Sequence, residues 1–128
     1  MKKQLCSLLM ALALVVGLLP SAARAAENAP SFADVSAAAW YADAVQYAYE
    51  RDLMTGVSES EFAPDGTATR GQIVTILWRL AGSPVVNYAM RYADVDEGAW
   101  YGEAVRWAAS TGVVTGYSES SFGPSDAI

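Results

Sequence analysis

Two stretches of this 128-residue chain match each other at a fixed offset of 60 positions. Asp34 and Asp94 form one matched pair, and Gly56 and Gly116 form another. The other matches are residues 33–35, 40–41, 44–45, 55–56, 58–60, 62 and 64 with their counterparts 60 positions later. A fixed period of this kind indicates two copies of one structural unit that bury apolar faces against each other. Since the counterpart of residues 69–84 is missing, we expect about one and a half units.

The first 25 residues precede the repeat and have the pattern of a secretory signal peptide. Lys2 and Lys3 give a positive start, residues 5–19 are an apolar run without charge, and Ala23-Arg24-Ala25 fits a cleavage site. A membrane-spanning helix needs about 20 apolar residues, more than this run offers. We therefore expect residues 1–25 to be removed and residues 26–31 to form a short mature N-terminus.

Removing that segment would change the composition in two ways. The single cysteine, Cys6, would leave with it, so the exported chain would have no disulfide. Of the 8 basic residues, Lys2, Lys3 and Arg24 would also leave, so 5 would face 14 acidic residues and the net charge would be −9. This charge argues against binding nucleic acid or an anionic membrane, and an anionic ligand would have to be met by particular arginines.

Each copy begins with a segment that predicts a helix over about residues 38–51 or their counterparts. Ser36 and Asp96 are suitable N-caps, and Asp52 and Gly112 fit a left-handed C-cap. The apolar positions follow helical spacing, which favours core packing: Trp40, Ala44, Tyr47 and Ala48 in copy one, and Trp100, Ala104, Trp107 and Ala108 in copy two.

A loop and a second helix complete the first copy. Residues 53–68 are rich in turn residues, and among them we expect Leu53, Met54 and Phe62 to be buried. The segment Thr69-Arg70-Gly71-Gln72 fits a capping box that starts the helix, and Gly82 before Pro84 fits its end. In copy two the first helix has no second helix of its own. We expect Trp100 and Trp107 there to be partly exposed.

These motifs resemble the S-layer homology domain of bacterial cell-surface proteins. The resemblance rests on residues 32–35, 40–45, 53–56, 62–65 and 69–72 and on their counterparts in copy two. It makes residues 32–84 one repeat, residues 85–91 a linker, and residues 92–128 a second repeat truncated before its second helix.

The resemblance implies an all-α fold of tandem helix-loop-helix repeats, part of a pseudo-threefold helical spindle that three repeats normally build. It also implies a secreted protein at the bacterial cell wall or S-layer surface. The grooves between repeats would bind secondary cell-wall polysaccharide carrying pyruvylated sugars, which anchors the protein non-covalently. Further repeats in cis or in trans would be partners; nucleic acid and, after cleavage, membrane would not.

In this family the threonine-arginine motif supplies ligand contacts, which are Thr69 and Arg70 here. A pyruvate ketal presents a carboxylate, and Arg70 stands at a helix start, where free N–H groups favour anions. A guanidinium can pair a carboxylate through two hydrogen bonds, and Gly71 would leave room for a sugar. Alternatively, Arg70 pairs with Asp34 or Asp65 and stabilises the fold. Gln72 stands where the family often has an acid, which would weaken binding or change the preferred glycan.

Other residues complete the candidate site. Gly56 would lie beside the ligand groove of the family, and Trp40 would stack on a sugar if it is not in the core. Asp34, an acid with which Arg70 could pair, is also included. Asp34 and Asp94 also invite comparison with the carboxylate pair of a glycosidase. Because they are the same position in two copies, hydrogen bonding within a turn is favoured instead.

We expect no enzyme, no cofactor and no metal site. The chain has no histidine, its one cysteine lies in the signal segment, and no glycine loop for phosphate is present. The run from Asp94 to Gly98 fails the spacing of a calcium loop. Two other functions stay open: a self-assembly module of a surface layer, and the anchor end of a longer exported polysaccharide-degrading enzyme.

Overall fold

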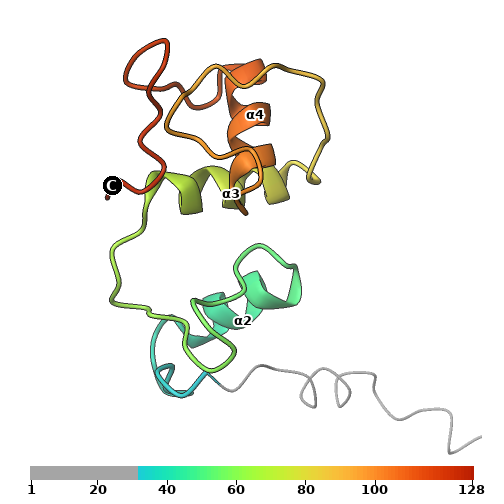
Figure 1. The fold of residues 1–128 in the computed structure, drawn as a ribbon. Helices are drawn as coiled ribbons and strands as arrows, with labels where there is room; N and C mark the ends of the chain where they lie inside the picture. Colours follow the sequence, from blue (N-terminus) through green and yellow to red (C-terminus); the bar gives the residue numbers. More distant parts are fainter. Residues whose placement is uncertain (1–31) are drawn as a thin grey trace, which may run out of the picture. The chain divides into compact units, whose positions relative to one another are not determined.

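The computed structural model describes residues 32–128, so the expected signal peptide 1–25 and N-terminal segment 26–31 lie outside the described residues (Figure 1). The described part has three helices and no strand: α2 (Ala42–Glu50), α3 (Arg70–Leu80) and α4 (Gly102–Thr111). The predicted all-α fold is thus confirmed. None of these helices has the length and apolar character needed to cross a membrane.

The first helix of each copy begins later than predicted. Its N-cap is Tyr41 in α2 and Tyr101 in α4, and neither makes a side-chain cap hydrogen bond. Ser36 and Asp96 instead cap the turn before the helix: Ser36 Oγ accepts from the Ala38 N–H at 3.3 Å, and Asp96 Oδ1 accepts from the Gly98 N–H at 2.9 Å. The predicted N-caps were wrong because the same side chains also stabilise turns.

The capping box and the Gly112 C-cap are confirmed, whereas the C-caps of α2 and α3 are Arg51 and Ala81, one residue before the expected Asp52 and Gly82. Gly112 is the left-handed C-cap of α4 with φ 72°, and Asp52, its counterpart after α2, has φ 54°. At the start of α3 the Gln72 N–H donates to Thr69 Oγ1, and Gln72 Oε1 accepts from the Thr69 N–H at 2.8 Å. Gly82, with φ 87°, lies just beyond the end of this helix.

Helix α3 belongs to copy one by sequence but packs on copy two. Val74 of α3 is fully buried in one cluster with six residues of copy two, which are Tyr92, Val95, Ala104, Val105, Ala108 and Phe122. α3 and α4 are the one helix pair in contact within residues 32–128. The first helix of copy two, which has no second helix of its own among the described residues, is thus covered by the second helix of the preceding copy.

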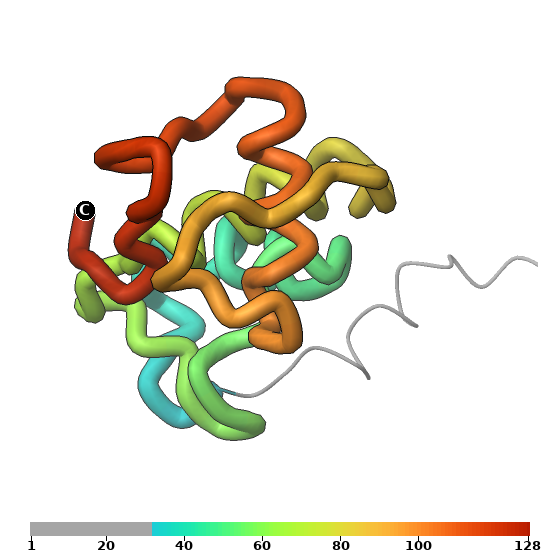
Figure 2. The backbone as a smooth tube through the Cα atoms, turned by 45° about the horizontal axis from the view of Figure 1, so that its top comes forward, coloured from blue at the N-terminus to red at the C-terminus, as the bar shows by residue number. Residues whose placement is uncertain are grey.

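The last residues of the chain run alongside the start of α3 (Figure 2). The N–H groups of Arg70 and Gly71 donate to the carbonyls of Asp126 and Pro124 at 2.9 and 2.8 Å. In return, the Ile128 N–H donates to the Ala68 carbonyl at 3.0 Å. Backbone hydrogen bonds thus fix α3 to copy two at one end, and apolar packing fixes it along its length.

The expected core position of Trp40 is wrong. Trp40 is 93% exposed and Trp100 is 61% exposed, since both lie in the turn before the helix and not on its buried stripe. The partial exposure expected for Trp100 is confirmed, and Trp107 is half-buried against the core cluster. Leu53, Met54 and Phe62 are half-buried, whereas the counterpart of Phe62 in copy two, Phe122, is completely buried.

Candidate functional site

Asp34 and Asp94 each tie the long loop of their copy to its first turn. Asp34 accepts from the N–H groups of Phe62 and Ala63, and Asp94 accepts from those of Phe122 and Gly123, all between 2.6 and 3.1 Å. The two aspartates thus form hydrogen bonds that hold the fold, as expected, but these bonds reach N–H groups 28 and 29 residues away and do not lie within a turn.

These hydrogen bonds stabilise the charged form of both carboxyls. The N–H of Phe62 lowers the pKa of Asp34 below its ordinary value of 3.8. Burial raises the pKa of Asp94, but the N–H groups of Phe122 and Gly123 and the Ser121 hydroxyl outweigh it, so this pKa is also lowered. Two carboxylates held ionised in separate turns lack the proton that a glycosidase acid must donate.

The start of α3 has protein partners for its first N–H groups. Those of Arg70 and Gly71 bond to carbonyls of copy two, and that of Gln72 bonds to Thr69. A Cβ added at Gly71 would lie 2.9 Å from the Pro124 carbonyl oxygen. The N–H groups expected to favour an anion are thus already paired, and the space at Gly71 admits the backbone of copy two.

Arg70 extends from the helix start across the loop of copy two. Its Nε donates to the Phe122 carbonyl at 2.9 Å, and its Nη2 donates to the Thr115 carbonyl at 2.7 Å. Its guanidinium carbon lies 4.5 Å from the ring centre of Tyr117 and 4.8 Å from that of Phe122. Arg70 therefore pairs with carbonyls and aromatic faces, not with Asp34 or Asp65, and Nη1 has no hydrogen bond to any residue of 32–128.

A second arginine stands at the other end of the same aromatic row. The Tyr92 and Phe122 ring centres are 5.3 Å apart, and the guanidinium carbon of Arg91 lies 5.3 Å from the Tyr92 ring centre. The Tyr92 hydroxyl accepts from Arg91 Nη2 at 3.4 Å and from the Gly116 N–H at 3.1 Å. We call this group the arginine junction: Arg70, Arg91, Tyr92, Tyr117 and Phe122.

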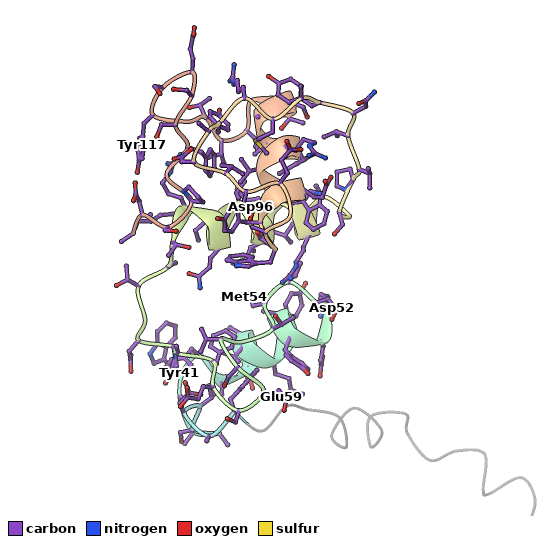
Figure 3. All side chains as sticks on the ribbon, viewed as in Figure 1. Tyr41, Asp52, Met54, Glu59, Asp96 and Tyr117 are labelled. Atoms are coloured by element: carbon purple, nitrogen blue, oxygen red, sulfur yellow. The ribbon has the colours of Figure 1, made fainter. Side chains whose placement is uncertain are left out.

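The arginine junction presents both charge and an aromatic face to solvent. Tyr117 is 62% exposed at the edge of the copy-two loop (Figure 3), and Arg91 is exposed as well. The hydrogen bond to the Tyr92 hydroxyl raises the pKa of Arg91, so its charge is retained at any physiological pH. Cationic groups beside an exposed ring suit a ligand that carries a carboxylate next to an apolar face.

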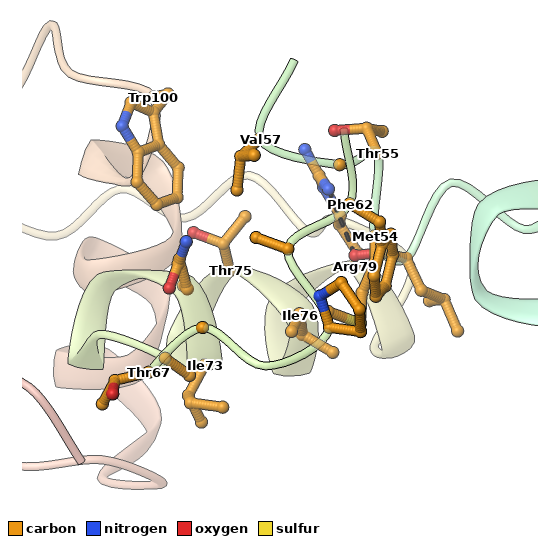
Figure 4. Close-up of a pocket in the computed structure, with 17 residues that line it drawn as sticks. Met54, Thr55, Val57, Phe62, Thr67, Ile73, Thr75, Ile76, Arg79 and Trp100 are labelled. Atoms are coloured by element: carbon orange, nitrogen blue, oxygen red, sulfur yellow. Dashed lines mark hydrogen bonds between the residues drawn. The ribbon is translucent and has the colours of Figure 1, made fainter. Parts of the chain in front are cut away.

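A separate cavity of about 550 Å³ lies between α3 and the loop of copy one (Figure 4). Gly56 and Gln72 line it, together with the ring of Trp100. Arg79 also lines it and donates from Nη1 to the Leu53 carbonyl at 3.1 Å. Many of its walls are apolar, including Met54, Phe62, Ile73 and Ile76.

The predicted site residues therefore fall into two groups. Thr69, Arg70, Gly71 and Gln72 lie together at the start of α3, where the backbone N–H group of each donates to a protein oxygen. Gly56 lines the cavity beside α3, Asp34 bonds its own loop, and Trp40 is exposed and does not border that cavity.

Sequence reasoning missed Arg91, Tyr92 and Tyr117. A usable signal was present, since these are positions where the copies differ. Tyr117 corresponds to Val57, Tyr92 to Phe32 and Arg91 to Ser31. Within residues 32–128 no group of three acidic, cysteine or histidine side chains could hold a metal ion.

Comparison with known proteins gives a family match. The family model of the S-layer homology domain matches residues 31–74 and 91–128. No solved structure matches the chain.

Several curated proteins are similar over part of their length. A surface-layer 125 kDa protein of Lysinibacillus sphaericus is 44% identical over 52 residues, which is 41% of this chain and 4% of that protein. An endoglucanase of Bacillus sp. (strain KSM-635) is 30% identical over 98% of this chain and 14% of its own. A cellulosome-anchoring protein of Acetivibrio thermocellus is 24% identical over 77% of this chain and 23% of its own. The chain thus spans less than a quarter of each of these relatives.

Proposed function

The chain belongs to the S-layer homology domain family of bacterial cell-surface proteins, and from this premise we propose that it anchors its protein to the cell wall by binding an acidic polysaccharide at the arginine junction. The ligand is a secondary cell-wall polysaccharide with pyruvylated sugars. The observation that supports this site is Arg70, which lies over the exposed Tyr117 ring with Nη1 without a partner among the described residues.

Each part of the junction has a role in this proposal. Arg70 and Arg91, at opposite ends of the aromatic row, each pair with a carboxylate of the pyruvylated polysaccharide, because guanidinium groups bind carboxylates through strong charge-assisted hydrogen bonds. The Tyr117 ring supports the apolar face of a sugar. Thr69, Gly71 and Gln72 hold the helix start that aims Arg70, while Gly56, Trp40 and Asp34 serve the corresponding loop and turn of copy one.

Binding to isolated wall polysaccharide, measured by calorimetry, tests this proposal. Arg91→Ala and Tyr117→Ala should each weaken binding and leave the melting temperature almost unchanged, because both side chains are exposed. Arg70→Ala should weaken binding by about 1.5–3 kcal/mol, the range for hydrogen bonds to charged groups, and should also lower stability.

Copy one offers a matched control, since the guanidinium of Arg51 lies 3.6 Å above the ring centre of the exposed Tyr47. Arg51→Ala and Tyr47→Ala should bind as wild type does, and glycan stripped of its pyruvate should bind poorly to every variant. A folded Arg70→Ala protein with unchanged affinity would mean that the junction is not the site.

A second candidate is favoured by the names of relatives such as the endoglucanase. We propose as an alternative that this unit is the anchor part of a longer exported polysaccharide-degrading enzyme, whose catalytic part lies elsewhere. Reading the coding sequence on both sides of the segment for Met1–Ile128 would test this alternative.

A further inference from the structure

Trp100 and its counterpart Trp40 lie in equivalent turns but in different surroundings. Each turn directly precedes the first helix of its copy. Trp40 is 93% exposed, whereas Trp100 is 61% exposed and its ring lines the cavity beside α3 (Figure 4). The two helices begin with nearly the same backbone angles, since Tyr41 and Tyr101 have φ −96° and −95°. The difference between the two turns therefore lies in their side chains.

In copy two, Arg106 ties the turn to the helix. Its Nη2 forms an ion pair with Glu97, which lies three residues before Trp100. Its Nη1 donates to Glu103 Oε1 at 2.6 Å, three residues after Trp100. One guanidinium thus holds both ends of the segment 97–103 that carries the Trp100 ring, and its planar set of N–H donors fixes their geometry. We call this group the turn clamp: Glu97, Glu103 and Arg106.

Copy one lacks the turn clamp. Glu97 corresponds to Ala37 and Arg106 to Gln46, so neither charge of the pair between turn and helix is present. Gln46 instead donates from Nε2 to Glu50 Oε1 at 2.9 Å, one turn further along α2. Within residues 32–128, no side-chain hydrogen bond or ion pair ties the turn of copy one to its helix.

The turn of copy two also lies closer to its helix start than the sequence of copy one allows. Gly102 is buried, and a Cβ added there would lie 2.5 Å from the Glu97 carbonyl oxygen, too close for any side chain. The counterpart of this glycine, Ala42, has such a Cβ, so the Ala37 carbonyl must lie further away. The glycine thus helps to bring Glu97 within reach of Arg106.

Stability alone is a poor explanation of the turn clamp. The Arg106 side chain is only 19% exposed, and among the described residues neither its Nε nor Glu103 Oε2 has a hydrogen-bond partner, although both atoms are buried. Buried polar atoms without a partner are destabilising, and a buried ion pair is often no more stable than apolar residues of the same volume. What the clamp does provide is one fixed arrangement of the turn.

We propose that Arg106 is a positioning residue that, through Glu97, holds the Trp100 ring fixed at the wall of the cavity. Gln72 lines the same cavity and lies two residues beyond Arg70, so the start of α3 links the cavity to the arginine junction. The fixed ring stacks on a sugar unit of the polysaccharide without the entropy loss of ordering a mobile side chain. This role of the ring rests on the proposed glycan binding.

Fluorine NMR of the full chain labelled with fluorotryptophan tests the positioning. The chain has four tryptophans, and replacing each by phenylalanine assigns its resonance. We expect a narrow line for Trp40 and a broader one for Trp100, because a fixed ring moves only with the whole protein. Glu97→Ala should narrow the Trp100 line at least about twofold. Its melting temperature should stay close to that of wild type, because the Glu97 side chain is 62% exposed.

Glu50→Ala is the matched control. It also removes an exposed glutamate with one polar side-chain partner, Gln46, but on the helix of copy one. All four resonances should keep their wild-type line widths, and the polysaccharide should bind this variant as it binds wild type.

The reciprocal variant places a turn clamp in copy one. Ala37→Glu and Gln46→Arg supply the pair between turn and helix, Ala42→Gly lets the turn approach, and Asp43 already stands at the position of the second acid. In this triple variant the Trp40 line should broaden toward that of the fixed ring in copy two.

Calorimetry with isolated wall polysaccharide tests the role of the fixed ring. Glu97→Ala should bind about two- to tenfold more weakly than wild type, the effect of having to order one side chain. An unchanged Trp100 line in Glu97→Ala would overturn the positioning role, and unchanged affinity beside a narrowed line would overturn its part in binding. If wild type binds no polysaccharide, the proposed function fails, while the NMR line widths still decide whether Arg106 positions Trp100.

Discussion

At the scale of single residues, the same position has different consequences in the two copies. Ala63 and Gly123 follow the phenylalanine of each loop, and both have left-handed backbone angles, with φ 59° and 72°. Glycine adopts this conformation without strain, whereas alanine is destabilised by about 1–2 kcal/mol. Copy one therefore contains a local strain that copy two lacks.

Replacing Ala63 by glycine should stabilise the chain. The relief of strain outweighs the greater flexibility of glycine in the unfolded chain, which opposes it by about 0.4–1 kcal/mol, so the net gain should approach about 1 kcal/mol. Urea unfolding measures it. The reverse change, Gly123→Ala, should be clearly destabilising, because its Cβ would collide with Tyr117 and Asp126. A less stable Ala63→Gly protein would refute the strain argument.

Acid should destabilise the fold through Asp34 and Asp94. Both have a pKa below the ordinary 3.8, so their contribution to folding is fully present above about pH 4. It is lost as the pH falls through the lowered pKa, because the folded carboxyls must then take up protons. Asp94→Asn should lower stability at pH 7 by about 1 kcal/mol. The melting temperature of this variant should also fall less than that of wild type when the pH is lowered.

Glu59→Gln, an exposed change in the copy-one loop, serves as the control for that titration. It should leave the melting temperature at pH 7 and its decline in acid as they are in wild type. If Asp94→Asn melts at the wild-type temperature from pH 3 to 7, the hydrogen bonds to Phe122 and Gly123 do not stabilise the loop.

At the scale of the element, local signals predicted some helix ends and failed at others. Thr69 with Gln72 and the glycine at 112 were sufficient because one residue or one short motif determines each geometry. Ser36 and Asp96 misled because a side chain that caps a helix can equally cap a turn. The tryptophan at 40 was placed in the core for the same reason, since the helix was started one turn too early.

The capping box stabilises the start of α3, and through this helix it also stabilises the packing of α3 on copy two. Thr69→Ala should destabilise the protein by about 1 kcal/mol, as loss of an N-cap does, because the Gln72 N–H then loses its acceptor. Gln72→Glu should leave stability close to wild type, because glutamate completes the same capping box. Thermal unfolding followed by circular dichroism compares the two, and equal melting temperatures for Thr69→Ala and wild type would contradict the role of the cap.

At the scale of the whole described chain, the packed unit does not coincide with the sequence repeat, because α3 of copy one packs on copy two. A period of 60 is the same whether the second helix covers its own copy or the next one, so periodicity alone could not predict the packing of α3. The hydrogen-bond partners of Arg70 could not be predicted either, because they are backbone carbonyls, which every residue has. The family resemblance and the all-α fold were predictable, since both depend on short motifs that occur in order.

Hydrogen exchange should reveal this offset. Amides of α3 and α4 share one buried cluster and should exchange together, at the slowest rates of residues 32–128. Amides of α2 should exchange faster, because Val45 is the one buried residue of that helix. Exchange followed by mass spectrometry measures both, and α2 amides as slow as those of α4 would contradict an offset unit.

The offset also bears on how such proteins change length in evolution. Because a helix of one copy covers the next, a duplication of 60 residues inserts a new copy that already brings the helix needed by its successor. The first helix of the new copy is in turn covered by the second helix of the copy before it. Arrays can therefore gain or lose whole periods by recombination while every internal junction keeps its complementary surfaces, and only the copy at the head of the array depends on a helix from outside.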